Sequence, residues 1–413
     1  MKIYKINDNK FKSIYISYNF TMPVESNDIF SNNSVLGALM AKSSKQYPNQ
    51  KEIERYLNGL YGASYDVNVE KFGDLYNLEF RAEVINKKFL PEKEDVLEDM
   101  LSFISSMIYE PADWTIENIS REKEFILERI NERKDEKLKY GVQKMEELLC
   151  GGEPFGNFLF GNIEDVLKID KNILIDSYKK LICAPVTIIV SGNLDGYDNI
   201  DELFDKYFKN KIKSNDICAL DYNTRKNNYI KFEEVKEEQD TTQSILSLGF
   251  KIIDSSMEDF YALNLYNAIL GTTPSSKLFQ NVREKESLAY TVRSRYYRFK
   301  NMLVIYAGIN KENYTKAVDL IKEQIESMKK GEITTEEFTS AKDSLMADLN
   351  EWKDSKVAMA KMVFSNIIAY NDANITIDQM RENINEVTLE DVIKVANKVN
   401  LEKIFYLGGS INE

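Results

Sequence analysis

The sequence contains no histidine among its 413 residues. Histidine is the base of Ser-His-Asp and Cys-His sites, a frequent zinc ligand and the usual proton shuttle near neutral pH. Its absence excludes all of those sites from this chain. Carboxylate chemistry, a Ser-Lys pair or oxygen-ligated Mg²⁺ remains open.

Cysteine and glycine are also scarce. The three cysteines, Cys150, Cys183 and Cys218, are far apart and lack the spacing of a metal site. They indicate free thiols in a reducing compartment. The 17 glycines form neither a P-loop nor a dinucleotide fingerprint, so no phosphate-binding loop is predicted.

Long apolar runs are missing as well. No stretch has the length of a membrane helix, and the first residues lack the pattern of an export signal. We therefore expect a cytoplasmic protein without a membrane partner. The formal net charge of −13 argues against nucleic acid and would suit a basic peptide or protein.

What is present is a pattern that occurs twice. Each half of the chain shows strand, helix, hairpin, helices and a terminal strand, and the terminal strands end similarly, IIVSGN at 188–193 and FYLGGS at 405–410. This predicts an α+β fold of two homologous domains, each an antiparallel-rich β-sheet packed by several α-helices. The predicted domains are residues 1–208 and 229–413, joined by a polar, lysine-rich linker at 209–228.

Residues 276–300 are the most informative stretch. A helix ends at Glu286-Ser287, and a strand follows in which Tyr290 alternates in step with Val292. Arg283 near the helix end and Tyr290 early in the strand would together hold a peptide carbonyl or an oxyanion. On spacing alone, the simpler interpretation is a surface arginine and a half-buried strand tyrosine.

Two segments carry a resemblance to a known family. KLFQNVREKESLAY at 277–290 and KQYPNQKEIERYLNGLYGA at 45–63 resemble the pitrilysin/insulinase metallopeptidase family. The layout is most similar to the short bacterial members and to the subunits of the mitochondrial processing peptidase. The resemblance covers essentially the whole chain.

The resemblance implies a degenerate metal site. Active members carry His-x-x-Glu-His and, far downstream, a third ligand, Glu; here Ser34, Gly37 and Ala38 stand in the motif and Arg129 stands at the third position. Glu122 lies two helical turns before Arg129, where the family has a glutamate, and the two would pair near the vacated site. The alternative is a solvated Lys/Glu/Arg face. We expect no metal or cofactor in this chain.

The resemblance also gives Arg283 and Tyr290 a role. In two-chain members, an Arg and a Tyr from the subunit without zinc hold the substrate at the partner's zinc. The expected function is thus a non-catalytic subunit of a heterodimeric zinc peptidase, with zinc in a paralogous partner and an extended peptide added to a sheet edge at 63–69 or 290–295. The alternatives are a peptide-binding or scaffold homodimer and a Mg²⁺ enzyme, although the carboxylates show no clustering that Mg²⁺ requires.

Overall fold

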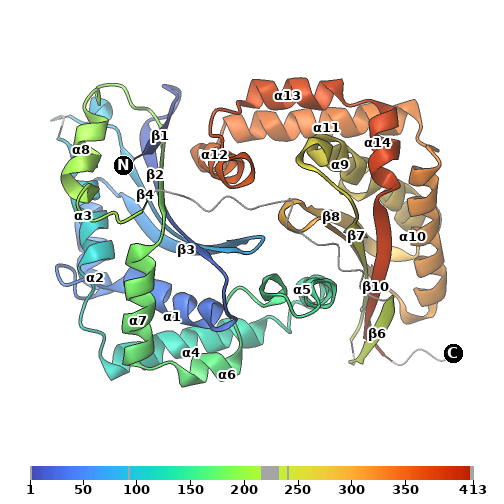
Figure 1. Cartoon of the computed structure of the whole chain (residues 1–413), viewed down its shortest axis with the longest axis horizontal. Coiled ribbons are helices and arrows are strands. Elements are labelled where there is room, and N and C mark those ends of the chain that lie inside the picture. Colours follow the sequence, from blue (N-terminus) through green and yellow to red (C-terminus); the bar gives the residue numbers. More distant parts are fainter. Residues whose placement is uncertain (1, 92–93, 215–231, 240, 410–413) are drawn as a thin grey trace. The chain divides into compact units, whose positions relative to one another are not determined.

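The structure, a computed structural model, describes residues 2–91, 94–214, 232–239 and 241–409. The chain forms two compact units, and neither is contiguous in sequence. The first unit combines residues 1–131, 157–220 and 352–375; the second combines residues 132–156, 221–351 and 376–413. Figure 1 shows the elements of both units coloured along the chain.

The two units contain sheets of the same topology. The first has the order β1-β5-β2-β4-β3 and the second β6-β10-β7-β9-β8. In each, the terminal strand pairs parallel with the first strand, and the other pairings are antiparallel. The α+β prediction of two homologous domains is confirmed. The strands are β1 Ile3–Asn7, β2 Ser13–Pro23, β3 Ser64–Phe72, β4 Leu75–Ile85, β5 Val186–Gly192, β6 Glu233–Glu238, β7 Ser244–Ile252, β8 Ala289–Tyr297, β9 Met302–Ile309 and β10 Val399–Gly408.

Helices cover the sheets in both units. The first unit contains α1 Asp28–Lys42, α2 Gln50–Gly59, α3 Val96–Tyr109, α4 Ile116–Glu132, α6 Ile163–Lys168, α7 Lys171–Cys183, α8 Ile200–Phe208 and α12 Lys356–Tyr370. The second contains α5 Lys137–Cys150, α9 Phe260–Asn267, the π-helices η5 Ala268–Thr272 and η6 Phe279–Lys285, α10 Tyr314–Lys329, α11 Thr335–Lys353, α13 Ile377–Glu386 and α14 Leu389–Ala396.

Alternation along the strands places one apolar face of each sheet against its helices. In the first unit, Tyr18 and Phe20 of β2 and Leu78 and Phe80 of β4 are fully buried in the core formed with α1, α3 and α7. The corresponding residues of β7 and β9 build the core of the second unit with α9, α10 and α14. These residues are two apart along each strand, so they share one face of their sheet.

The opposite face of each sheet carries a helix from the other half of the sequence. On the second sheet, Met145 and Leu149 of α5 pack in one cluster with Phe405 and Leu407. A Cβ at Gly249 of β7 would lie only 2.3 Å from Met145 Sδ, so glycine permits this close contact of helix and sheet. α5 therefore docks through an apolar interface.

α12 combines an apolar contact with polar ones on the first sheet: its Phe364 packs edge-on against Phe72 of β3, with the ring centroids 5.3 Å apart. Its Lys356 Nζ donates to Ser13 Oγ and Glu83 Oε1, each at 2.6 Å, and its Lys361 Nζ donates to Glu70 Oε1 at 2.6 Å. The same side of the sheet holds the buried Glu79. Because α5 and α12 cross between halves, the contiguous boundaries 1–208 and 229–413 are corrected to the segments given above. Residues 215–228 of the expected linker lie outside the described residues.

Two local expectations also change. The apolar spacing over residues 114–149 predicts one long helix, but α4 ends at Glu132 and α5 begins at Lys137, and they belong to different units. Strand β1 was not predicted. It is only five residues long and pairs with β5, which lies about 180 residues later in the chain, so no local pattern marked it.

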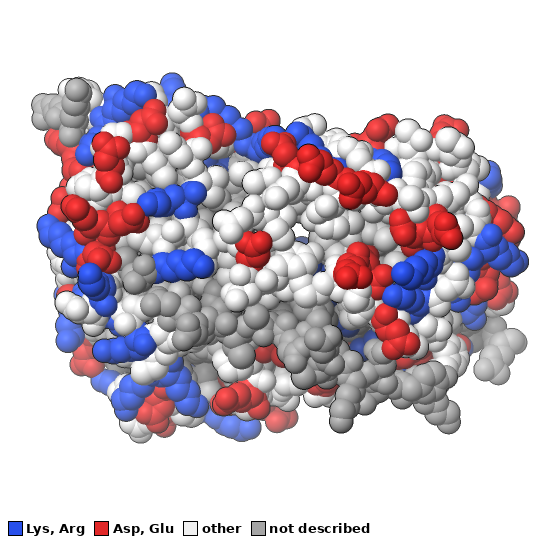
Figure 2. All heavy atoms as spheres, turned by 45° about the horizontal axis from the view of Figure 1, so that its top comes forward, with Lys and Arg blue, Asp and Glu red and all other residues white. Residues whose placement is uncertain are grey.

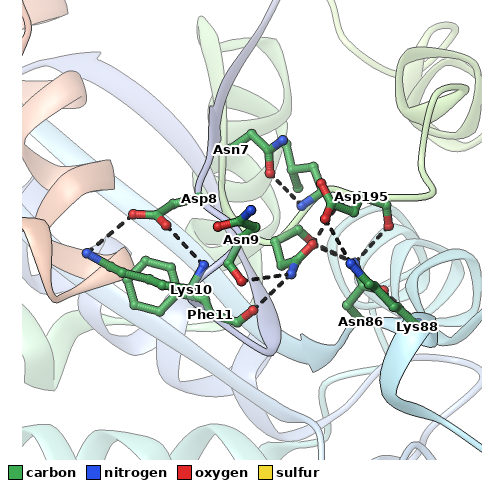
Figure 3. Close-up of polar contacts among 10 residues, drawn as sticks. Asn7, Asp8, Asn9, Lys10, Phe11, Asn86, Lys88 and Asp195 are labelled. Atoms are coloured by element: carbon green, nitrogen blue, oxygen red, sulfur yellow. Dashed lines mark hydrogen bonds and ion pairs between the residues drawn. The ribbon is translucent and has the colours of Figure 1, made fainter.

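Buried asparagines tie together the loops at one end of the first sheet (Figure 3). The Asn193 side chain, 1% exposed, donates to the carbonyl oxygens of Asn9 at 3.3 Å and Phe11 at 3.0 Å, and it accepts from the Asp195 amide at 3.0 Å. Asn86 donates to the Asn193 carbonyl oxygen at 2.8 Å. These bonds join three separate loops and satisfy backbone groups in two of them.

We expect Asn193→Ala to lower the free energy of unfolding by about 2–3 kcal/mol, because it leaves several backbone groups without partners. Asn7→Ala is the matched control: its exposed side chain accepts a single bond, from the Leu194 amide at 2.9 Å, and should cost under about 1 kcal/mol. Urea unfolding of both variants makes the comparison, and equal losses would contradict the assignment of the network.

Charge is mixed over the surface. Figure 2 shows lysine and arginine interspersed with aspartate and glutamate over the face in view. No helix among the described residues has the length and apolar character needed to cross a bilayer.

Candidate functional site

The residues predicted to occupy the vacated metal motif lie on α1. Ser34 and Gly37 are buried and Ala38 is half-buried. The Ser34 hydroxyl donates to the carbonyl oxygen of Leu159 at 3.3 Å. A Cβ at Gly37 would lie 3.3 Å from Leu78 Cδ1, so the helix packs closely on the sheet there. These side chains offer one hydroxyl and no carboxylate or imidazole.

The predicted third position lies on α4, and Glu122 on that helix is fully buried. Its carboxylate accepts from Lys42 Nζ at 2.7 Å and from Arg121 Nε at 3.0 Å. Arg129 is exposed and lies over the Phe125 ring, 5.3 Å from its centroid. The expected pairing of Arg129 with Glu122 is thus replaced by one with Lys42.

Lys42 is the residue that sequence reasoning missed. It follows Ala38 by four residues and Ser34 by eight, so it lies on the same face of α1 as those two positions. That spacing was a usable signal. Its ammonium also lies 5.0 Å from the Phe125 ring centroid, so Lys42 and Arg129 both contact this ring.

These residues do not fit zinc. Zinc binds thiolate, imidazole and carboxylate ligands, whereas this cluster has one buried carboxylate already held by two cations. Within the described ranges, no three His, Cys, Asp or Glu side chains lie close enough to hold a metal. The first unit thus offers a buried ion pair on α1 and α4.

The second candidate site begins in η6. This π-helix runs from Phe279 to Lys285 and carries Arg283 in its last turn. The guanidinium lies over the Phe279 ring, 4.6 Å from the centroid, and its Nε is 3.6 Å from Glu284 Oε1. Ser287 then adopts φ 51°, a left-handed conformation that turns the chain into β8. π-Helical turns occur frequently at functional sites.

A β-bulge in β8 determines the position of Tyr290. Ala289 pairs with Ile309 and Thr291 pairs with Gly308, so Tyr290 is an extra residue in β8 with no partner in β9. Without the bulge, Tyr290 would point with Val292 into the core, as the alternation predicted. With it, the side chain is 78% exposed. Bulges commonly redirect a side chain in this way at functional positions.

Arg283 and Tyr290 line one cavity of about 500 Å³ in the second unit. Gln243, Gly308 and Asn310 line it too. A Cβ at Gly308 would lie 2.7 Å from the Gln243 side chain, so glycine leaves room for that amide. The cavity therefore combines a guanidinium, a phenol and amide groups, all able to bind carbonyl or carboxylate oxygen.

β8 is also the outermost described strand of its sheet, and β3 is the outermost described strand of the other. Both segments that were expected to form sheet edges, 63–69 and 290–295, lie in these strands. The Arg283–Tyr290 cavity thus lies at the start of an edge strand. An extended peptide that pairs with that strand would reach both side chains.

Comparison with known proteins tests the family resemblance. Residues 172–345 match the family described as the peptidase M16 inactive domain. The probable inactive metalloprotease YmfF of Bacillus subtilis is 27% identical over 411 residues, which cover 98% of this chain and 95% of that protein. The resemblance to the pitrilysin/insulinase metallopeptidase family is confirmed.

Two further proteins are similar to this chain, one over part of its sequence and one in fold. The uncharacterized zinc protease YmxG of Bacillus subtilis is 28% identical over 223 residues, covering 53% of this chain and 49% of that protein. The crystal structure of a conserved protein from Enterococcus faecalis superposes with a TM-score of 0.89 at 25% identity, covering 100% and 97% of the two chains.

A peptidase M16 inactive domain from Pseudomonas fluorescens shares the fold with a TM-score of 0.82 at 18% identity, covering 100% of this chain and 97% of that one. Together these findings support an inactive, M16-type metalloprotease-like protein. The lack of histidine in this chain agrees with that description.

Proposed function

We propose that this M16-type chain is the non-catalytic subunit of a heterodimeric zinc peptidase. In this proposal it binds an extended peptide and supplies Arg283 and Tyr290 to the zinc site of a paralogous partner. The observation that carries the proposal is the shared cavity of these two side chains at the start of an edge strand. The bulge exposes a tyrosine that regular pairing would bury.

The first unit also agrees with a non-catalytic role in which the partner supplies the metal. The motif positions hold Ser34, Gly37 and Ala38, and Lys42 occupies the carboxylate of Glu122. Ser34, Gly37 and Ala38 at the motif positions offer neither the imidazole ligands for zinc nor a general base. The metal and the attacking water would come from a partner that carries His-x-x-Glu-His.

The side chains of the cavity suit the stabilisation of the oxyanion that forms during peptide hydrolysis. When a peptide bond is attacked, negative charge develops on the carbonyl oxygen, and a guanidinium and a phenol placed beforehand stabilise it. Backbone hydrogen bonds to β8 would hold the peptide in line with them and tolerate many sequences. Arg283 and Tyr290 thus act as oxygen-binding groups, and no proton transfer is required of either.

Purification from native lysate, with metal analysis and peptidase assays, tests the proposal. Alone, the chain is expected to bind no stoichiometric zinc and to cleave no peptide. With the paralogous zinc subunit that co-purifies, it should raise peptide turnover by about a hundredfold or more. Hydrolysis by the isolated chain would overturn the proposal. A stable homodimer that binds peptides but activates no zinc subunit would favour the scaffold alternative.

A further inference from the structure

Beyond the cavity, β8 carries two exposed arginines on the face of the sheet that also packs α5. Arg293 pairs across the sheet with Tyr306 of β9, and Arg295 pairs with Val304. Both arginines are exposed, whereas the intervening Ser294 is buried. Side chains two residues apart on a strand lie about 7 Å from one another on the same face. The edge strand therefore presents two guanidiniums in a row that begins beside the cavity.

Neither arginine has a carboxylate partner within the part of the chain that the structure describes. Other arginines are paired: Arg81 with Asp66 and Arg55 with Glu52. Arg295 lies over the Tyr297 ring, 4.9 Å from the centroid, and the Tyr297 hydroxyl donates to Glu146 at 2.6 Å. The net charge of the protein is −13, so these two guanidiniums, which lack carboxylate partners among the described residues, make this strand edge locally positive on an acidic protein.

We propose that β8 selects extended peptides with acidic side chains at alternate positions. A peptide strand added to β8 places every second side chain on the face of Arg293 and Arg295, at the same 7 Å repeat. Each guanidinium can then form a charge-assisted, bidentate pair with a carboxylate. This inference rests on the proposed binding of peptides at β8 and names the class of peptide bound.

The proposed preference for acidic peptides is opposite to the preference for basic ligands that the net charge predicts. Net charge predicts a basic ligand, but at physiological ionic strength charges beyond about 8 Å are largely screened. A peptide on β8 therefore responds mainly to the arginines it touches.

Fluorescence anisotropy with the full-length chain tests the inference. The probes are three labelled peptides of about ten residues, matched in length to a strand, in which threonine alternates with glutamate, glutamine or lysine. The glutamate peptide is expected to bind about fivefold to tenfold more tightly than the glutamine peptide, and the lysine peptide most weakly. The preference should shrink as salt is raised.

Variants assign the preference to β8. The double variant Arg293→Gln/Arg295→Gln should bring the glutamate and glutamine peptides to equal affinity while leaving the glutamine peptide unchanged. Arg55→Gln, at an exposed arginine already paired with Glu52, is the matched control and should preserve the preference. Equal affinity of the three peptides for the unmodified chain overturns the acidic selection and leaves peptide binding intact. Failure of all three to bind removes the proposed function as well.

Discussion

Arg283→Ala is expected to lower the kcat/KM of the reconstituted two-chain peptidase by about a hundredfold. Loss of one preorganised donor to an oxyanion typically has an effect of that size. Arg283 lines the cavity and is 40% exposed, so truncation should leave the fold of η6 intact. The variant is assayed for peptide hydrolysis after gel filtration shows that the two chains still assemble.

Lys285→Ala provides the matched control for this prediction. Lys285 lies in the same π-helix, is exposed, and donates to the Asn281 side chain at 2.9 Å without lining the cavity. Its loss should leave turnover within about twofold. Tyr290→Phe removes one hydroxyl and should lower turnover by about tenfold. If the Arg283 and Lys285 variants are equally active, the cavity does not contribute to the reaction.

Lys42→Ala is expected to lower the free energy of unfolding by about 3 kcal/mol. Glu122 is fully buried, and removing the ammonium at 2.7 Å leaves its charge with Arg121 alone. Breaking a buried ion pair by removing one partner typically costs about 3–5 kcal/mol, and the remaining arginine places this case at the lower end. Urea unfolding followed by circular dichroism measures the change.

Two further variants separate this ion pair from general effects of substitution. Lys42→Met combined with Glu122→Leu removes both charges and should recover most of the lost stability, because an apolar pair needs no counterion. Lys45→Ala, at an exposed lysine just after α1, should change stability by less than about 0.5 kcal/mol. A Lys42→Ala variant as stable as the parent would show that Glu122 does not need this partner.

Much of the architecture was predictable from local pattern. Alternating apolar and polar residues mark β2 and β4, and the repeated order of elements predicted the shared topology of the two sheets. The family resemblance at 277–290, more than spacing, singled out Arg283 and Tyr290, and both line one cavity. Such features depend on residues close together in the chain, which is why sequence alone indicated them.

The remaining features depend on contacts between distant residues. The bulge at Tyr290 is set by the register of β8 on β9, which alternation within β8 does not contain. The pairing of Lys42 with Glu122 joins residues eighty positions apart. The docking of α5 on β7 likewise follows from shape, since Gly141 and Gly249 permit the close approach.

The crossing of α5 and α12 bears on how such a chain arose. Two identical half-length polypeptides that exchanged one helix with each other would form a domain-swapped dimer. In that dimer each sheet would already be covered by a helix of the other copy. Fusing their genes would join the two without requiring any new packing. The two helices then diverged in how they contact their sheets: Met145 and Leu149 of α5 pack in an apolar cluster, whereas Lys356 of α12 donates to Ser13 and Glu83.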